Sequence, residues 1–102
     1  MRKSYLLLLL FVSCSNFGEL TLVNDLSKLL KEVSGNETVA NSNLIWMMND
    51  SGNKSEVFGV SQAGKIESVV KVNAKNHDWE DLTSDEVGNL YIGDFGNNSG
   101  KR

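Results

Sequence analysis

A segment that occurs twice is the feature of this chain that most constrains its fold. Residues 43–53 and 89–97 both read Asn-Leu, then a short apolar and aromatic run, then Asp-x-Gly-Asn. The acidic residues of the two copies, Asp50 and Asp94, are 44 positions apart. A period of about 40 to 50 residues is typical of repeat units that each contain four β-strands. The repeat therefore predicts a chain built from such units.

The residues around the two copies predict the strands of these units. Short apolar runs alternate with turns rich in Gly and Asn, which favours strands over helices. The strands predicted in this way span residues 37–40, 44–48, 56–60, 66–72, 81–83 and 90–92. Four strands in each period indicate an all-β protein made of antiparallel, four-stranded blades of a β-propeller, about two blades and incomplete. A β-sandwich or an open meander is the competing architecture.

The segment that precedes these strands is open to two predictions. Leucine and valine residues at positions 22, 26, 29, 30 and 33 recur at helical spacing. They would form one face of a helix of about three turns, with Asn24 or Asp25 as its cap. The alternative is an entry strand at residues 28–33.

The first fourteen residues have the pattern of a lipoprotein leader. Arg2 and Lys3 precede an unbroken run of seven apolar residues at 6–12, which is typical of a secretory signal peptide. The run is shorter than the roughly 20 residues that span a bilayer. Residues 10–14, Leu-Phe-Val-Ser-Cys, resemble a bacterial lipobox, in which the cysteine is acylated and becomes the first residue of the mature protein. The alternative is an ordinary signal peptide in which Cys14 occurs by chance.

The resemblance to a lipobox implies a domain organisation and a location. A signal peptide would span 1–13, the lipidated Cys14 and a tether would span 14–19, and a partial β-propeller domain would span 20–102. Two or three acyl chains on Cys14 would anchor the protein stably to a membrane. We therefore expect the bacterial cell envelope, with the chain on the outer membrane and facing the periplasm or the exterior. The sequence leaves the leaflet open.

The charge and cysteine content exclude several classes of function. Ten Lys and Arg residues against thirteen Asp and Glu residues give a formal net charge of -3. This balance argues against a nucleic-acid partner, which would require a basic stripe. One cysteine rules out a disulfide framework and a cysteine-based zinc site within one chain.

Three blocks of sequence resemble a family of bacterial envelope β-propellers. The blocks are Trp-x-x-Asn-Asp-Ser-Gly at 46–52, Asp-Trp-Glu-Asp-Leu at 78–82 and Gly-Asp-Phe-Gly-Asn-Asn at 93–98. The resemblance covers residues 31–102, and members of the family are several times longer, so it implies a truncated product or fragment. Open blade faces would then favour self-association through Trp46, Phe58, Val70 and Tyr91. The chain departs from the family at Asn36, where an apolar residue usually begins a strand.

Acidic residues beside the predicted turns are the candidate metal ligands. Oxygen ligands of this kind suit a hard cation such as calcium, and in related propellers such side chains hold calcium at one end of the central channel. The residues that we expect at this site are Asp50, Asp78, Glu80 and Asp94. Neither turn has the glycine pattern of an EF-hand. The alternative is that these residues are turn formers whose side chains bind nearby backbone.

Asp78 and Glu80 form the most specific pair in this set. Strand alternation would place both on one face, where two like charges raise a pKa or require a cation. The pair could bind a metal or act in acid–base chemistry, or it could lie on the solvated face of an ordinary strand. We expect His77 to be a turn residue, and no residue is predicted to be catalytic, because no serine lies in a nucleophile motif.

These observations predict two functions of different classes. The first is a membrane-anchored binding or scaffold module of the cell envelope, stabilised by calcium, with a ligand that the sequence does not identify. The second is a fragment of a metal-dependent propeller hydrolase of the lactonase, esterase or phytase kind. Fold analogy alone does not choose between them.

Overall fold

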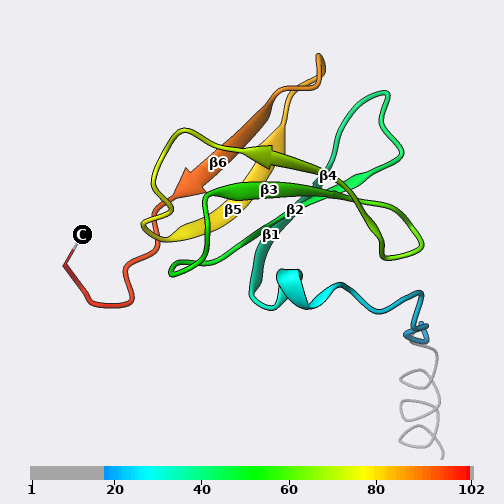
Figure 1. The fold of residues 1–102 in the computed structure, drawn as a ribbon, viewed down its shortest axis with the longest axis horizontal. Helices are drawn as coiled ribbons and strands as arrows, with labels where there is room; N and C mark the ends of the chain where they lie inside the picture. The colour runs from blue at the N-terminus through cyan, green and yellow to red at the C-terminus, as the bar shows by residue number, and fades with distance from the viewer. Residues whose placement is uncertain (1–17, 102) are drawn as a thin grey trace, which may run out of the picture.

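The computed structural model describes residues 18–101 (Figure 1). The predicted signal peptide and Cys14 lie outside these residues. The described elements, in chain order, are the short 3₁₀-helix η1 (Lys28–Leu30) and the strands β1 (Val33–Thr38), β2 (Ile45–Asn49), β3 (Glu56–Val60), β4 (Ile66–Lys71), β5 (Trp79–Ser84) and β6 (Leu90–Asp94).

The strands form two antiparallel sheets. Strands β1, β2, β3 and β4 make a four-stranded sheet in chain order, and β5 pairs with β6 in a second, two-stranded sheet. The prediction of an all-β, antiparallel fold is confirmed. Within residues 18–101, no helix has the length and apolar character needed to cross a membrane.

The two hairpins β1–β2 and β5–β6 repeat one another in detail. Val33 pairs with Asn49 at the start of the first hairpin, and Trp79 pairs with Asp94 at the start of the second. In each case the next pairing skips one residue of the first strand, so both hairpins carry an irregularity at the same place. The sequence repeat therefore reflects a structural repeat.

The register of this repeat differs by one residue from the one that the sequence suggested. The Asn49 Oδ1 atom accepts a hydrogen bond from the Glu32 N–H at 3.3 Å, and the Asp94 Oδ1 atom accepts one from the Asp78 N–H at 3.0 Å. Asn49, not Asp50, is thus the counterpart of Asp94. The first copy has one extra residue directly after its strand, since two residues separate Asn49 from Gly52 and one separates Asp94 from Gly96, so matching the Asp-x-Gly-Asn letters hid this shift.

A buried cluster joins the two sheets. Met48 and Val57 of the first sheet pack with Trp79 and Leu82 of the second, and all four are buried. Strand β1 lies beside β5, with the Ser84 hydroxyl donating to the Thr38 carbonyl at 3.2 Å. The four-stranded sheet therefore buries one face against the β5–β6 hairpin.

Glycine at position 35 permits this close approach of β1 to β5. A Cβ atom there would lie 2.8 Å from Met48 Cε and 3.0 Å from the Leu82 backbone nitrogen. Gly35 and Asn36 lie inside β1. The predicted strand at 37–40 began too late, because Gly and Asn have low strand propensity but here pair with β2.

The other face of the four-stranded sheet is covered in part by η1. Leu30 packs with Phe58 and Val60, and Phe58 is only 6% exposed. Self-association through Phe58 is thus not available, whereas Val70 and Tyr91 are about half exposed, at 46% and 54%.

Neither prediction for the segment before β1 is correct. Residues 18–27 have no regular secondary structure, and one short 3₁₀ turn follows at η1, where Ser27 Oγ accepts a hydrogen bond from the Leu29 N–H at 3.3 Å. Strand pairing starts at Val33, after this turn. Leu22 is 80% exposed, so the apolar stripe does not pack as a helix face.

Candidate metal centre

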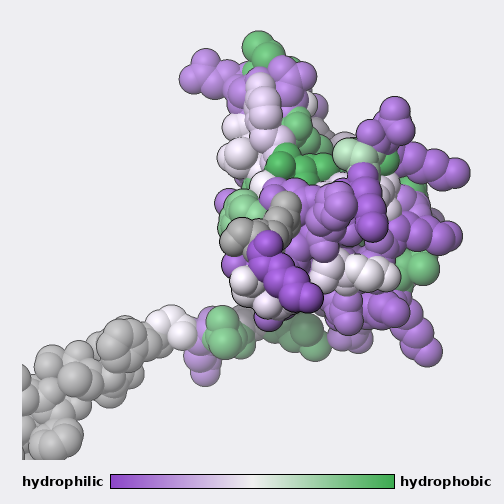
Figure 2. Space-filling model, turned by 90° about the vertical axis from the view of Figure 1, so that its left-hand side faces the viewer, coloured by the Kyte–Doolittle hydropathy of each residue, from purple (hydrophilic) through white to green (hydrophobic). Residues whose placement is uncertain are grey.

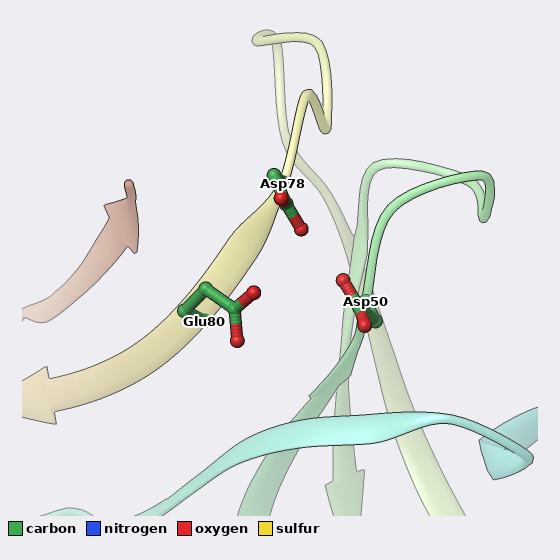
Figure 3. A group of neighbouring side chains, drawn as sticks. All are labelled: Asp50, Asp78 and Glu80. Atoms are coloured by element: carbon green, nitrogen blue, oxygen red, sulfur yellow. The ribbon is translucent and has the colours of Figure 1, made fainter. Parts of the chain in front are cut away.

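Three carboxylates converge where the two sheets meet. Asp50 follows β2, Asp78 directly precedes β5, and Glu80 lies in β5. One carboxylate oxygen from each lies within 4.8 Å of the others. Figure 3 shows the three side chains directed toward a common space between the end of β2 and the start of β5. This arrangement can hold a metal ion, since hard cations bind groups of carboxylate oxygens.

Asp78 is the buried member of the cluster. Its side chain is 7% exposed, and its Oδ1 atom is buried with no hydrogen-bond partner among the described residues. A Cβ atom at Gly96 would overlap the Asp78 carboxylate, so glycine at this position leaves room for the carboxylate. A buried oxygen without a partner is costly. A cation in the cluster would satisfy it.

The three carboxylates of the cluster place like charges close together. The pKa of Glu80 is raised above its ordinary value by burial first, then by the negative charges of Asp50 and Asp78. Like charges at this separation disfavour the ionised form unless a cation offsets them. The cluster therefore favours either a proton or a metal ion between its members.

Asp94, the fourth predicted ligand, has another role in the structure. Its two carboxylate oxygens accept hydrogen bonds from the backbone N–H groups of His77, at 3.2 Å, and Asp78, at 3.0 Å. The carboxylate thus caps the turn that leads into β5 and lies outside the group of three. It positions Asp78, whose side chain belongs to the group. His77 itself is exposed.

Asn76 is a residue of the site that was not predicted from the sequence. Its Nδ2 atom donates to the carbonyls of Asn49 and Asp50, each at 3.0 Å, and its Oδ1 atom accepts from the Trp79 N–H at 3.1 Å. The buried amide therefore ties the end of β2 to the start of β5. The one available signal was its position two residues before Asp78.

A cavity of about 530 Å³ adjoins the cluster. Asp78 belongs to both, and the described residues that line the cavity include no lysine or arginine. The lining residues are Ser51, His77, Asp78, Gly96, Asn97, Asn98 and Ser99. The cavity therefore meets the cluster at Asp78, and Asp50 and Glu80 are not among the described residues that line it.

The structure thus brings together Asp50, Asp78 and Glu80 from segments that are distant in the sequence, and it assigns Asp94 to their support. Such a group can hold a hard divalent cation, which would neutralise the repulsion and bind the orphaned Asp78 oxygen. Comparisons of the chain with protein-family models, with curated proteins and with solved structures found no match.

Proposed function

We propose that this chain is a membrane-anchored lipoprotein of the bacterial cell envelope and that its β domain is a calcium-stabilised binding or scaffold module. The lipobox-like leader supports the anchor at Cys14. The observation that carries the metal site is the buried Asp78 carboxylate, whose Oδ1 atom has no partner beside two further carboxylates.

Calcium is the cation that suits this site best. It takes about six to eight oxygen ligands in flexible geometry, and carboxylates bind it through one or two oxygens each. Asp50, Asp78 and Glu80 would supply the protein ligands, and water or a bound molecule in the adjoining cavity would supply the others. Because Asp50 directly follows β2 of one sheet, while Asp78 and Glu80 lie at the start of β5 of the other, the ion would link the sheets.

A β-propeller is the architecture that we propose for the domain. The repeated hairpins β1–β2 and β5–β6, with the same irregularity in the first strand, support repeat units of one kind. Strand β1 lies beside β5, so the first strands of the two units are neighbours, as they would be in adjacent blades. The site would then lie at the junction of two blades.

Calorimetric titration with calcium chloride tests the metal site. We expect one calcium per chain, and we expect Asp78→Asn to weaken binding about tenfold or more, because the site loses one of its three negative charges. Glu80→Gln, a change on the partly exposed side of the site, should weaken it as well and serves as a second variant if Asp78→Asn does not fold.

Glu67→Gln is the matched control, since Glu67 is an exposed carboxylate on the edge strand β4. It should bind calcium as the unchanged protein does. Absence of binding at millimolar calcium, or equal binding by Asp78→Asn and the control, would show that the three carboxylates are not a calcium site.

The second candidate function, a metal-dependent hydrolase, is favoured by one observation. His77 lines the same cavity as Asp78, so an imidazole and one of the proposed metal ligands border the same space. Calcium-dependent hydrolysis of a lactone or of p-nitrophenyl acetate, lost in His77→Ala, would support it. Calcium binding without turnover would favour the binding module.

A further inference from the structure

We propose that the outer edge of β6 and the apolar groove beside it bind an extended peptide strand of another protein, with apolar side chains at alternate positions. The proposal rests on the binding module of the proposed function, and it names the class of partner that this module would take. It does not depend on the metal centre, whose three carboxylates contribute nothing to the lining of the groove.

The groove lies where the second sheet is narrower than the first. The first sheet has four strands and the second has two, so β5 and β6 cover only part of the face against which they pack. A groove of about 450 Å³ remains between β6 and strands β2, β3 and β4, and the described residues that line it include no charged one. Figure 2 shows hydrophobic side chains gathered beneath the β5–β6 turn, which projects at the top of the view.

This groove continues the apolar interface that already joins the two sheets. Val57 belongs to the buried cluster with Trp79 of β5, whereas Val70, which pairs with Val57 across β3 and β4, is 46% exposed. Leu90 and Ile92 of β6 pack against the same cluster and also line the groove. The side chains of an occupant would therefore extend an existing core, so those that face the groove should be apolar.

The edge of β6 favours a strand as the occupant. Among residues 18–101, β6 pairs with β5 and with no other strand. Alternate residues of an edge strand direct their backbone N–H and C=O groups outward, where an added strand can bond them. A peptide that pairs with this edge would lie along the groove at the same time, so one extended segment would satisfy the backbone and fill the apolar space.

The four-stranded sheet supplies a template for the register of such a strand. In the repeated hairpins β6 corresponds to β2, and Ile92 is the counterpart of Met47. Met47 pairs with Phe58 of β3, and Val60 of β3 pairs two residues further along β2, at the position that Leu90 takes in β6. A strand added to β6 in the same way would direct its counterparts of Phe58 and Val60 into the groove.

A second copy of this chain does not fit the same edge. Two β6 strands paired edge to edge across a two-fold axis would place both four-stranded sheets on the same side of the joined hairpins. Each four-stranded sheet extends past the edge of β6, because residues of β3 and β4 line the groove there. The two sheets would then collide, whereas a single extended strand avoids the collision.

Titration of the full chain into a fluorescently labelled peptide tests the site by the change in anisotropy. The peptide copies residues 55–61, which contain β3 with Phe58 and Val60. We expect saturable binding, and we expect amide hydrogen exchange in β6 to slow when the peptide is bound. A control peptide with lysine in place of both Phe58 and Val60 should bind about tenfold more weakly or less, because it would bring charges into an apolar groove.

Val70→Lys and Val69→Lys form a matched pair of variants on β4. The two valines are almost equally exposed, at 46% and 47%, but Val70 lines the groove and Val69 lies on the opposite face of the strand. Val70→Lys should weaken peptide binding about tenfold or more, and Val69→Lys should leave it unchanged. Equal effects of the two variants, or no binding at millimolar peptide, would overturn the proposal.

Two further results would also overturn it. Slower exchange in β4 in place of β6 would show that the peptide adds to the other sheet. A dimer that Val70→Lys disrupts, without any peptide binding, would show that a second copy fills the groove.

Calcium titration of the same samples separates this proposal from the metal centre. Asp78→Asn should bind the peptide as the unchanged protein does, because the groove and the carboxylates are separate. Calcium binding without peptide binding would refute the strand site and leave the calcium site standing. Peptide binding without calcium binding would support the strand site and refute the calcium site.

Discussion

At the residue scale, the buried amide of Asn76 holds together backbone groups of both sheets. We expect Asn76→Ala to lower the free energy of unfolding by about 2–4 kcal/mol, because it leaves the Trp79 N–H and the carbonyls of Asn49 and Asp50 without their partner. Urea denaturation measures the change. Asn73→Ala, at an exposed position of the same loop, is the control, and an equal effect of the two variants would refute this role.

A glycine supplies the second prediction at this scale. We expect Gly35→Ala to destabilise the protein by about 1–3 kcal/mol, because the added Cβ would lie 3.0 Å from the Leu82 backbone nitrogen and force β1 away from β5. Gly18→Ala is the matched control, since a Cβ there would meet nothing within 4 Å. Thermal unfolding compares the two variants, and unchanged stability of Gly35→Ala would show that the sheets are not docked this closely.

At the scale of elements, the β5–β6 hairpin carries an acid-sensitive turn. Asp85 accepts hydrogen bonds from the Asn89 N–H at 2.8 Å, from Asn89 Nδ2 at 2.8 Å and from the Tyr91 hydroxyl at 2.8 Å. The bonds from Asn89 and then from Tyr91 lower the pKa of Asp85 to about 2, and the same contact raises the pKa of Tyr91. The hairpin therefore needs an ionised Asp85.

The sign of the pH effect follows from the lowered pKa. Since the folded chain binds the proton less readily than the unfolded chain, Asp85 contributes stability above pH 3.8 that is lost as the pH falls toward about 2. We expect Asp85→Asn to remove this part of the acid dependence of the melting temperature, while Glu86→Gln in the same turn keeps it. If the melting temperatures of Asp85→Asn and of the unchanged protein fell by the same amount between pH 4 and pH 2, the assignment would be contradicted.

The sequence predicted the elements unevenly, for physical reasons. Strand β3 lies where the apolar run predicted it, at 56–60, because its residues are β-formers between clear turns. β1 was placed too late because Ser34, Gly35 and Asn36 become strand only through pairing with β2. The leucine spacing before β1 resembled a helix, but Leu22 and Leu29 of this pattern stay largely exposed, and helical periodicity alone does not stabilise a helix.

At the scale of the whole molecule, the proposed ion would join the two sheets and so stabilise the complete fold. At a calcium concentration 100-fold above the dissociation constant, binding to the folded state adds about 2.7 kcal/mol. For a domain of this size we expect a rise in melting temperature of about 10 °C or more over that in EGTA. Magnesium, which requires stricter geometry, should raise it less. Equal melting temperatures in calcium and EGTA would argue against a structural ion.

The sequence predicts which residues are ligands of the site more readily than it predicts how they come together in space. Alternation along one strand was enough to pair Asp78 with Glu80. The approach of Asp50 to this pair depends on how two sheets dock, and the diversion of Asp94 to backbone N–H groups depends on a one-residue shift between the repeated hairpins. Asn76 was missed because an asparagine in a turn usually bonds its own loop, whereas this one reaches across to β2.

We propose that Asp50, Asp78 and Glu80 hold one calcium ion between the sheets. The most direct measurement is a crystal structure grown in calcium chloride, with an anomalous difference map collected at long wavelength. We predict a peak at which oxygens of all three carboxylates lie about 2.3–2.6 Å from the ion. A map without a peak at this position in saturating calcium, with the three side chains well ordered, would contradict it.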